Sequence, residues 1–71
     1  MEAKILQIME SWPLQVTLKT ADGIEHAMLA EKVSIWYFGV AVDPGVLRSN
    51  QRIRVLTRTP QGEIAELEIL N

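Results

Sequence analysis

The chain contains no cysteine, and its 71 residues include only one histidine, three prolines and four glycines. Without cysteine it can form neither a disulfide framework nor a thiolate site for metal or redox chemistry. His26 has no second histidine or cysteine to complete a catalytic or metal-binding set, so we interpret it as a surface histidine of a strand. The glycines are isolated, which excludes a glycine-rich phosphate loop. We therefore expect no enzyme activity, no cofactor and no metal site.

Long hydrophobic runs are also missing. The longest, Val33–Val42, has ten residues and is interrupted only by Ser34 and Gly39, whereas a membrane-spanning helix needs about 20. The first residues, Met1–Glu10, include an early acidic residue and lack the apolar centre of a secretory signal. Together with the absence of cysteine, these features predict a cytoplasmic protein that makes no membrane contact.

Neither positive nor negative charge is in large excess. Nine acidic and seven basic residues give a net charge of −2, which supplies no overall attraction to phosphate backbones. Hydrophobic residues make up 48% of the chain and charged residues 23%, as in folded globular domains. A chain of this length forms one domain, here residues 1–71, and buries a small core.

What the chain does have is alternation of apolar and polar residues, which predicts strands. The pattern is regular in Leu14–Thr20, Arg52–Arg58 and Glu63–Ile69, and less regular in Ala3–Glu10 and Ile24–Leu29. The side chains expected on the inner face are Leu14, Val16, Leu18, Ile53, Val55, Thr57, Ala65, Leu67 and Ile69.

Turn-forming residues separate these strands. Asp22-Gly23 predicts a two-residue hairpin turn, which would place His26 opposite Lys19. Asp43-Pro-Gly45 predicts a loop, and Pro60-Gln-Gly62 a three-residue hairpin turn with Gly62 in the left-handed position. The last hairpin would then pair Val55 with Leu67.

The segment from Ala30 to Val42 fits two patterns. Leu29, Val33, Trp36 and Val40 fall at helical spacing, and Gly39 could follow a helix end. Because β-branched and aromatic residues dominate, we expect instead an extended strand after one helical turn at residues 30–32. In such a strand Trp36 and Phe38 would enter the core, while Ile35 and Tyr37 would face outward.

The order of these elements predicts an all-β fold, a small barrel of five to six strands that is OB-like or, alternatively, SH3-like. Val16-Thr-Leu-Lys-Thr-Ala-Asp-Gly23 followed by Val46-Leu-Arg-Ser-Asn-Gln-Arg-Ile-Arg-Val55 resembles the layout of bacterial translation initiation factor one and related small RNA-binding barrels. The resemblance covers most of the chain and implies an OB fold and RNA binding. The present chain departs from that family in being acidic and lacking its basic surface.

Two surfaces are candidates for binding. The leading hypothesis is protein–protein association, including self-association, because aromatic and apolar residues are enriched at protein interfaces. Its candidate residues are Ile35, Trp36, Tyr37, Phe38, Val40 and Val42. The alternative is a groove for single-stranded nucleic acid, formed by Trp12, Arg48, Arg52, Arg54 and Arg58.

The arginines and Trp12 each have a structural interpretation as well. The hairpin register places Arg54 opposite Glu68, Leu56 opposite Glu66 and Arg58 diagonal to Glu66, which predicts a ladder of opposite charges. We favour this ladder over a phosphate-binding groove, which needs uncompensated positive charge. Trp12, beside Pro13 in a loop, is expected to cover the mouth of the barrel rather than to contact a base or a partner.

Overall fold

The computed structural model describes all residues, 1–71, and consists of six β-strands and one short 3-10 turn. None of its segments is a helix long and apolar enough to cross a membrane. The strands are β1 (Glu2–Met9), β2 (Gln15–Thr20), β3 (Gly23–Tyr37), β4 (Val40–Val42), β5 (Arg52–Arg58) and β6 (Ile64–Ile69), and the 3-10 turn η1 is Pro44–Val46.

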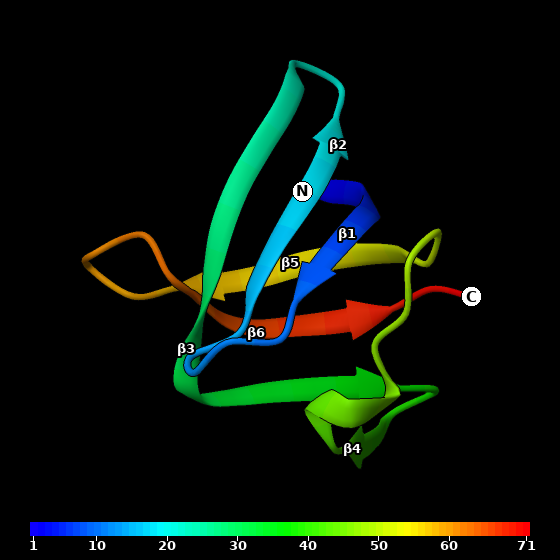
Figure 1. The fold of residues 1–71 in the computed structure, drawn as a ribbon. Helices are drawn as coiled ribbons and strands as arrows, with labels where there is room; N and C mark the ends of the chain where they lie inside the picture. The colour runs from blue at the N-terminus through cyan, green and yellow to red at the C-terminus, as the bar shows by residue number, and fades with distance from the viewer.

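Five of the strands close into a ring (Figure 1). The strand order β2-β1-β5-β6-β3-β4 is completed by pairing of β2 with β3, which leaves β4 outside the ring at the edge of β3. The pairing of β3 with β6 is parallel, and all the others are antiparallel. The structure confirms the predicted all-β fold, and its ring of five strands is barrel-like. Three strands in succession are joined to a C-terminal hairpin whose last strand returns beside β3, the strand order expected of an OB-like fold.

Strand β3 is the element that closes the ring. Its first residues pair with β2 and its last residues pair with β6, and the register shifts between Leu29 and Ser34, where it changes partner. In Figure 1 it bends sharply and continues at a steep angle to its first half. Residues 30–32 lie inside this strand, so the predicted helical turn is wrong. The need to pair with two partners keeps these residues extended.

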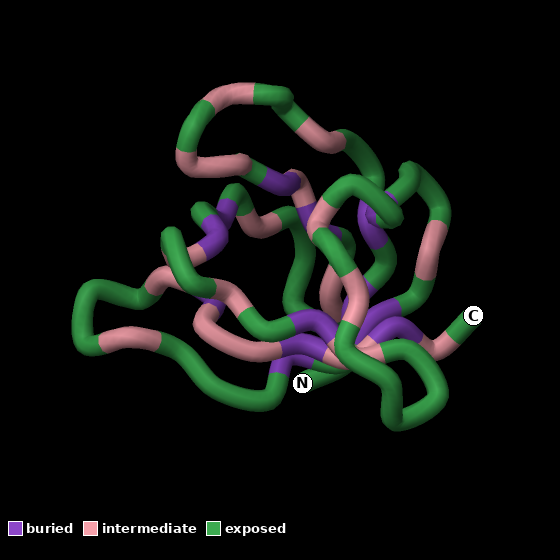
Figure 2. The backbone as a smooth tube through the Cα atoms, turned by 90° about the horizontal axis from the view of Figure 1, so that it is seen from below, coloured by how far each residue is buried: buried purple, intermediate pink, exposed green.

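Thirteen buried residues, all hydrophobic, form the core. Twelve of them lie in strands and Leu47 follows η1. In Figure 2 the buried stretches gather towards the middle of the molecule, while the peripheral loops are exposed or half-buried. The core residues are Ala3, Ile5, Val16, Leu18, Ala27, Leu29, Ile35, Leu47, Ile53, Val55, Ile64, Leu67 and Ile69. Most of the residues predicted to face inward are among them. Leu14 and Ala65 are half-buried instead, and Thr57 is exposed.

The C-terminal hairpin has the predicted register over most of its length. Val55 pairs with Leu67 and Arg54 with Glu68. Beyond this point the register shifts, and Thr57 rather than Leu56 lies opposite Glu66. The extra residue of this bulge turns Thr57 out of the core and makes the predicted pairing of Leu56 with Glu66 wrong.

The two predicted hairpin turns differ in outcome. Pro60-Gln-Gly62 forms the expected three-residue loop, in which Gly62 has a φ of +87° and the amide of Thr59 donates to the carbonyl of Glu63 over 2.8 Å. The first turn is displaced by one residue, because Gly23 pairs with Thr20. Its central residues are Ala21 and Asp22, so the predicted Asp22-Gly23 turn is wrong.

This shift changes the neighbour of His26, which pairs with Thr17 and not with Lys19 as predicted. The Oγ1 atom of Thr17 lies 3.1 Å from Nδ1 of His26. The side chain of His26 is exposed, as expected for a histidine on the outer face of a strand.

The first strand is tied to β5 by both backbone pairing and charge. Glu2 pairs with Arg54, and its carboxylate lies 3.2 Å from the guanidinium of Arg54 and 3.4 Å from that of Arg52. The hydrogen bond from Arg54 and the positive charge of that residue, with a smaller contribution from Arg52, lower the pKa of the Glu2 carboxyl below its ordinary value.

We expect Val55→Ala to lower the free energy of unfolding by about 1–3 kcal/mol, because it leaves a cavity in a core of few residues. The matched control is Leu56→Ala, which shortens the adjacent, exposed side chain and should change stability by less than about 0.5 kcal/mol. Urea unfolding of both variants measures the difference. Equal losses would mean that Val55 is not a core residue.

Acidification should destabilise the wild type more than a Glu2→Gln variant. Because the pKa of Glu2 is lowered in the folded state, its ionised form stabilises the fold above the unfolded pKa, near 4.5. That contribution is lost as the pH falls through the lowered folded value. Urea midpoints of both proteins at about pH 7 and about pH 3 test the prediction. Parallel losses in the two proteins would show that Glu2 contributes nothing to the pH dependence.

Candidate functional site

The apolar run Val33–Val42 folds into the end of β3, a tight turn and β4. Tyr37 pairs with Val40, so Phe38 and Gly39 are the two central residues of the turn. Their φ angles are +51° and +76°. Positive φ at both positions is the property of a type I′ turn, which fits the twist of the flanking strands. Gly39 adopts this conformation freely, whereas a bulky residue such as Phe38 rarely does.

The structure contradicts three of the predicted orientations, those of Ile35, Trp36 and Phe38. Ile35 is only 2% exposed and belongs to the core, so the prediction that it faces outward is wrong. Its strand partners are Leu67 on one side and Val42 on the other, which places it on the inner face. Phe38, predicted to enter the core, is 81% exposed because it lies in the turn and not in the strand.

The neighbouring aromatic residues differ in exposure. Trp36 is half-buried on the opposite face of β3 from Ile35, so the prediction that it enters the core is wrong. Its indole Nε1–H donates to Oε2 of Glu66 over 2.8 Å. Tyr37 is exposed, as predicted, and its ring centroid lies 4.6 Å from that of Phe38. Val42 is half-buried against the core. Of the six candidate interface residues, Tyr37, Phe38 and Val40 are therefore the ones that solvent reaches most.

A fourth residue, Val46 of η1, extends this exposed group. Tyr37 and Val46 line one hollow beside the hairpin. We call Tyr37, Phe38, Val40 and Val46 the hairpin-tip patch; Val40 is 62% exposed, and the patch contains no charged side chain. Sequence analysis missed Val46, because Asp43-Pro-Gly45 predicts a loop without indicating which element the loop approaches. Contiguous exposed apolar side chains are typical of interaction surfaces.

The arginines of β5 are compensated by carboxylates. Arg54 lies 3.2 Å from Glu68, as the predicted ladder requires, and also contacts Glu2. Arg58 lies 2.8 Å from Glu25 of β3 and not near Glu66, because the bulge redirects the end of β5. Paired arginines retain little net positive charge, so this strand has a weak attraction for a phosphate backbone.

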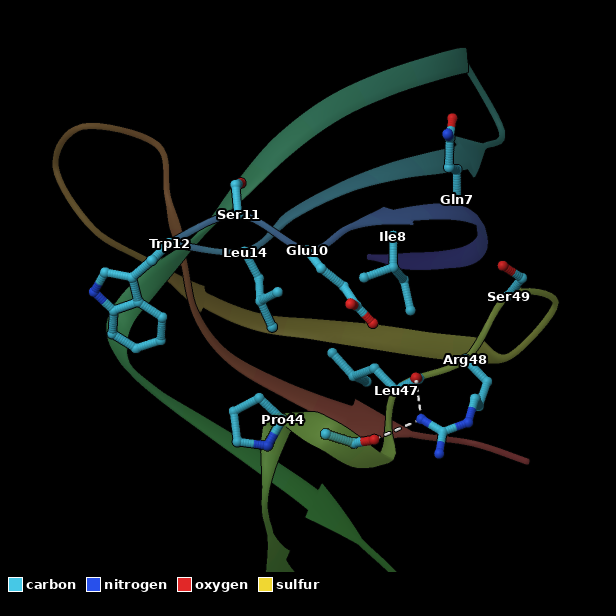
Figure 3. A pocket seen from close by; sticks show the side chains of 11 residues that line it. Gln7, Ile8, Glu10, Ser11, Trp12, Leu14, Pro44, Leu47, Arg48 and Ser49 are labelled. Atoms are coloured by element: carbon cyan, nitrogen blue, oxygen red, sulfur yellow. Dashed lines mark hydrogen bonds between the residues drawn. The ribbon is translucent and has the colours of Figure 1, made fainter.

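Trp12 and Arg48, the other two residues of the predicted nucleic-acid surface, line one hollow of about 830 Å³. Trp12 is 73% exposed, so the prediction that it covers the barrel mouth is wrong. In Figure 3 its ring points away from the hollow, whereas the Arg48 guanidinium turns back to the carbonyls of Gly45 and Leu47. The carboxylate of Glu10 lies in the same hollow, which therefore carries both signs of charge.

No group of three or more histidine, aspartate or glutamate side chains is arranged to hold a metal ion. Every buried side-chain nitrogen or oxygen atom has a hydrogen-bond partner. The structure thus offers two features with binding capacity: the hairpin-tip patch, which is apolar, and the Trp12–Arg48 hollow, which carries both signs of charge.

Comparison of the chain with protein-family models, with curated proteins and with solved structures gave no match, so its function must be inferred from its own residues.

Proposed function

We propose that this protein is a non-enzymatic β-barrel module that binds another protein through the hairpin-tip patch. One observation carries the proposal: Phe38 is 81% exposed at a backbone φ of +51°. Asn or Gly would occupy this position of a type I′ turn at lower cost. The sequence has instead a large apolar residue, at a site where it buries little within the chain.

A bulky residue held in the left-handed region costs on the order of 1–3 kcal/mol. Burial of an aromatic side chain would offset such a cost, but the Phe38 ring is mostly in water and its one aromatic neighbour is Tyr37. Phe38 therefore lowers the stability of the free chain, as residues of binding surfaces often do. Burial of Phe38 against a partner would recover it.

The alternative, binding of single-stranded nucleic acid, has less support. The resemblance to small RNA-binding barrels and the exposed indole of Trp12 favour it. Against it stand the carboxylates that pair with Arg52, Arg54 and Arg58. Phosphate binding requires positive charge that no carboxylate neutralises.

The cost of the turn can be measured directly. Phe38→Asn, which produces an Asn-Gly turn, should raise the free energy of unfolding by about 1 kcal/mol. Phe38→Ala is the control, since it removes the same ring but leaves a residue that disfavours positive φ, and it should stabilise the fold less. Urea unfolding at low protein concentration compares the three proteins. Equal stabilities of Phe38→Asn and Phe38→Ala would show that the turn stores no conformational cost.

Binding can be tested by photo-crosslinking in a lysate of the source cells. A benzophenone amino acid at position 38 should give protein adducts that survive nuclease treatment. The same amino acid at position 24 is the control, because Ile24 is also exposed, at 58%, beside the β2–β3 turn at the other end of the molecule (Figure 1). Adducts that disappear with nuclease would favour the nucleic-acid alternative. Equal labelling from positions 24 and 38 would refute the proposed surface.

A further inference from the structure

The hairpin-tip patch borders a hollow of about 260 Å³ at the end of the barrel. Tyr37 and Val42 of the β3–β4 hairpin form one wall, and Ile69 of β6, Val46 of η1, Gln51 and Asn71 complete the lining. None of these side chains is charged, and four of the six are hydrophobic. The hollow is therefore suited to an uncharged, apolar group.

The two polar side chains of the hollow already have partners within the chain. The Gln51 amide accepts from the backbone N–H of Arg48 over 2.7 Å and donates to the carbonyl of Val46 over 3.3 Å. The side-chain oxygen of Asn71 accepts from the backbone N–H of Arg52 over 2.7 Å. Apart from the Tyr37 hydroxyl, the contacts open to a ligand are mainly those of apolar side-chain atoms.

Phe38 is the most exposed of the chain's large hydrophobic residues and lies directly beside this hollow, with its ring 4.6 Å from the ring of Tyr37. Since an apolar cavity of about 150 Å³ accommodates benzene, a hollow of about 260 Å³ has room for a phenyl ring. Phe38 does not line the hollow of its own chain. One surface thus carries both a projecting aromatic ring and a hollow that fits such a ring.

A symmetric dimer requires such a surface, because the same patch of each subunit must fit its own copy. We propose that the protein partner is a second copy of this chain, and that Phe38 of each copy inserts into the hollow of the other. This inference rests on the proposed function of the hairpin-tip patch. The uncharged side chains of the lining support it further, because a second copy of this chain, with net charge −2, would meet no acidic side chain in the hollow itself.

The expected dimer is weak. Few side chains take part, so the interface falls at the low end of the sizes seen in protein complexes. A dissociation constant on the order of 10–100 μM is appropriate to such a contact. Insertion would remove the Phe38 ring from water. The free energy gained would offset the cost of holding this residue at a positive φ.

Sedimentation equilibrium of the purified chain tests the proposal from about 10 μM to about 1 mM. The wild-type mass should rise from 8.0 kDa towards twice that value. Phe38→Asn should remain at 8.0 kDa throughout, although it is folded and at least as stable. Ile24→Ser, which removes an exposed hydrophobic residue at the far turn, should dimerise like the wild type.

A pair of charged variants tests reciprocal insertion. Phe38→Lys alone and Val46→Glu alone should each be monomeric, because each places an unpaired charge in both contacts of its dimer. An equimolar mixture should form a heterodimer in which one contact is wild type and the other pairs lysine with glutamate. A mixture that stays monomeric, beside a wild type that dimerises through Phe38, would refute insertion into the hollow.

Failure of the dimer is distinguishable from failure of the proposed function. A wild-type chain that remains monomeric at about 1 mM, or a Phe38→Asn variant that still dimerises, overturns the second copy as partner. If position 38 nevertheless crosslinks to a different protein in the lysate, the proposed function stands and only the identity of the partner is wrong. If the chain stays monomeric and position 38 also yields no protein adduct, both proposals are wrong.

Discussion

The structure depends on the requirement that one strand, β3, satisfy two partners in succession. Its first half pairs with β2 and its second half with β6, so the ring of five strands closes through this strand. Because β6 occupies one side of the second half, the chain that follows can pair only on the other side. There it forms β4, outside the ring. The reversal into β4 needs a tight turn, and that turn carries Phe38 away from the core. The exposed patch is therefore a consequence of how the barrel closes.

Sequence patterns predicted the fold best where apolar and polar residues alternate. In β2, β5 and β6 the alternation identified the strands and most of the core, and the turn at Pro60–Gly62 fixed the register around Val55 and Leu67. The run Val33–Val42 has almost no polar residues, so the alternation that distinguishes inside from outside is absent. A type I′ turn is normally indicated by Asn-Gly or Asp-Gly, and Phe38-Gly39 does not give that signal. For that reason the orientations of Ile35 and Phe38 could not be predicted from the local sequence.

The ion pairs also differ in whether the sequence predicts them, according to how far apart the partners lie in the chain. The contact of Arg54 with Glu68 follows from the register of a single hairpin. Glu2 and Glu25, which pair with Arg52, Arg54 and Arg58, lie far away in the sequence and reach β5 only through the closed ring. Their effect is to neutralise a strand that resembles a basic groove when read alone. With that charge compensated, the exposed apolar residues of the hairpin-tip patch become the most distinctive part of the surface.

Strand β4 has a further consequence, for aggregation. An exposed edge strand can recruit strands from other molecules, and repeated recruitment leads to fibres. Here the edge is only three residues long and is followed at once by Asp43 and Pro44. A proline has no backbone N–H to continue a ladder, and an acidic side chain discourages close stacking of strands. The edge of β4 is therefore poorly suited to growing an extended sheet with strands of other molecules.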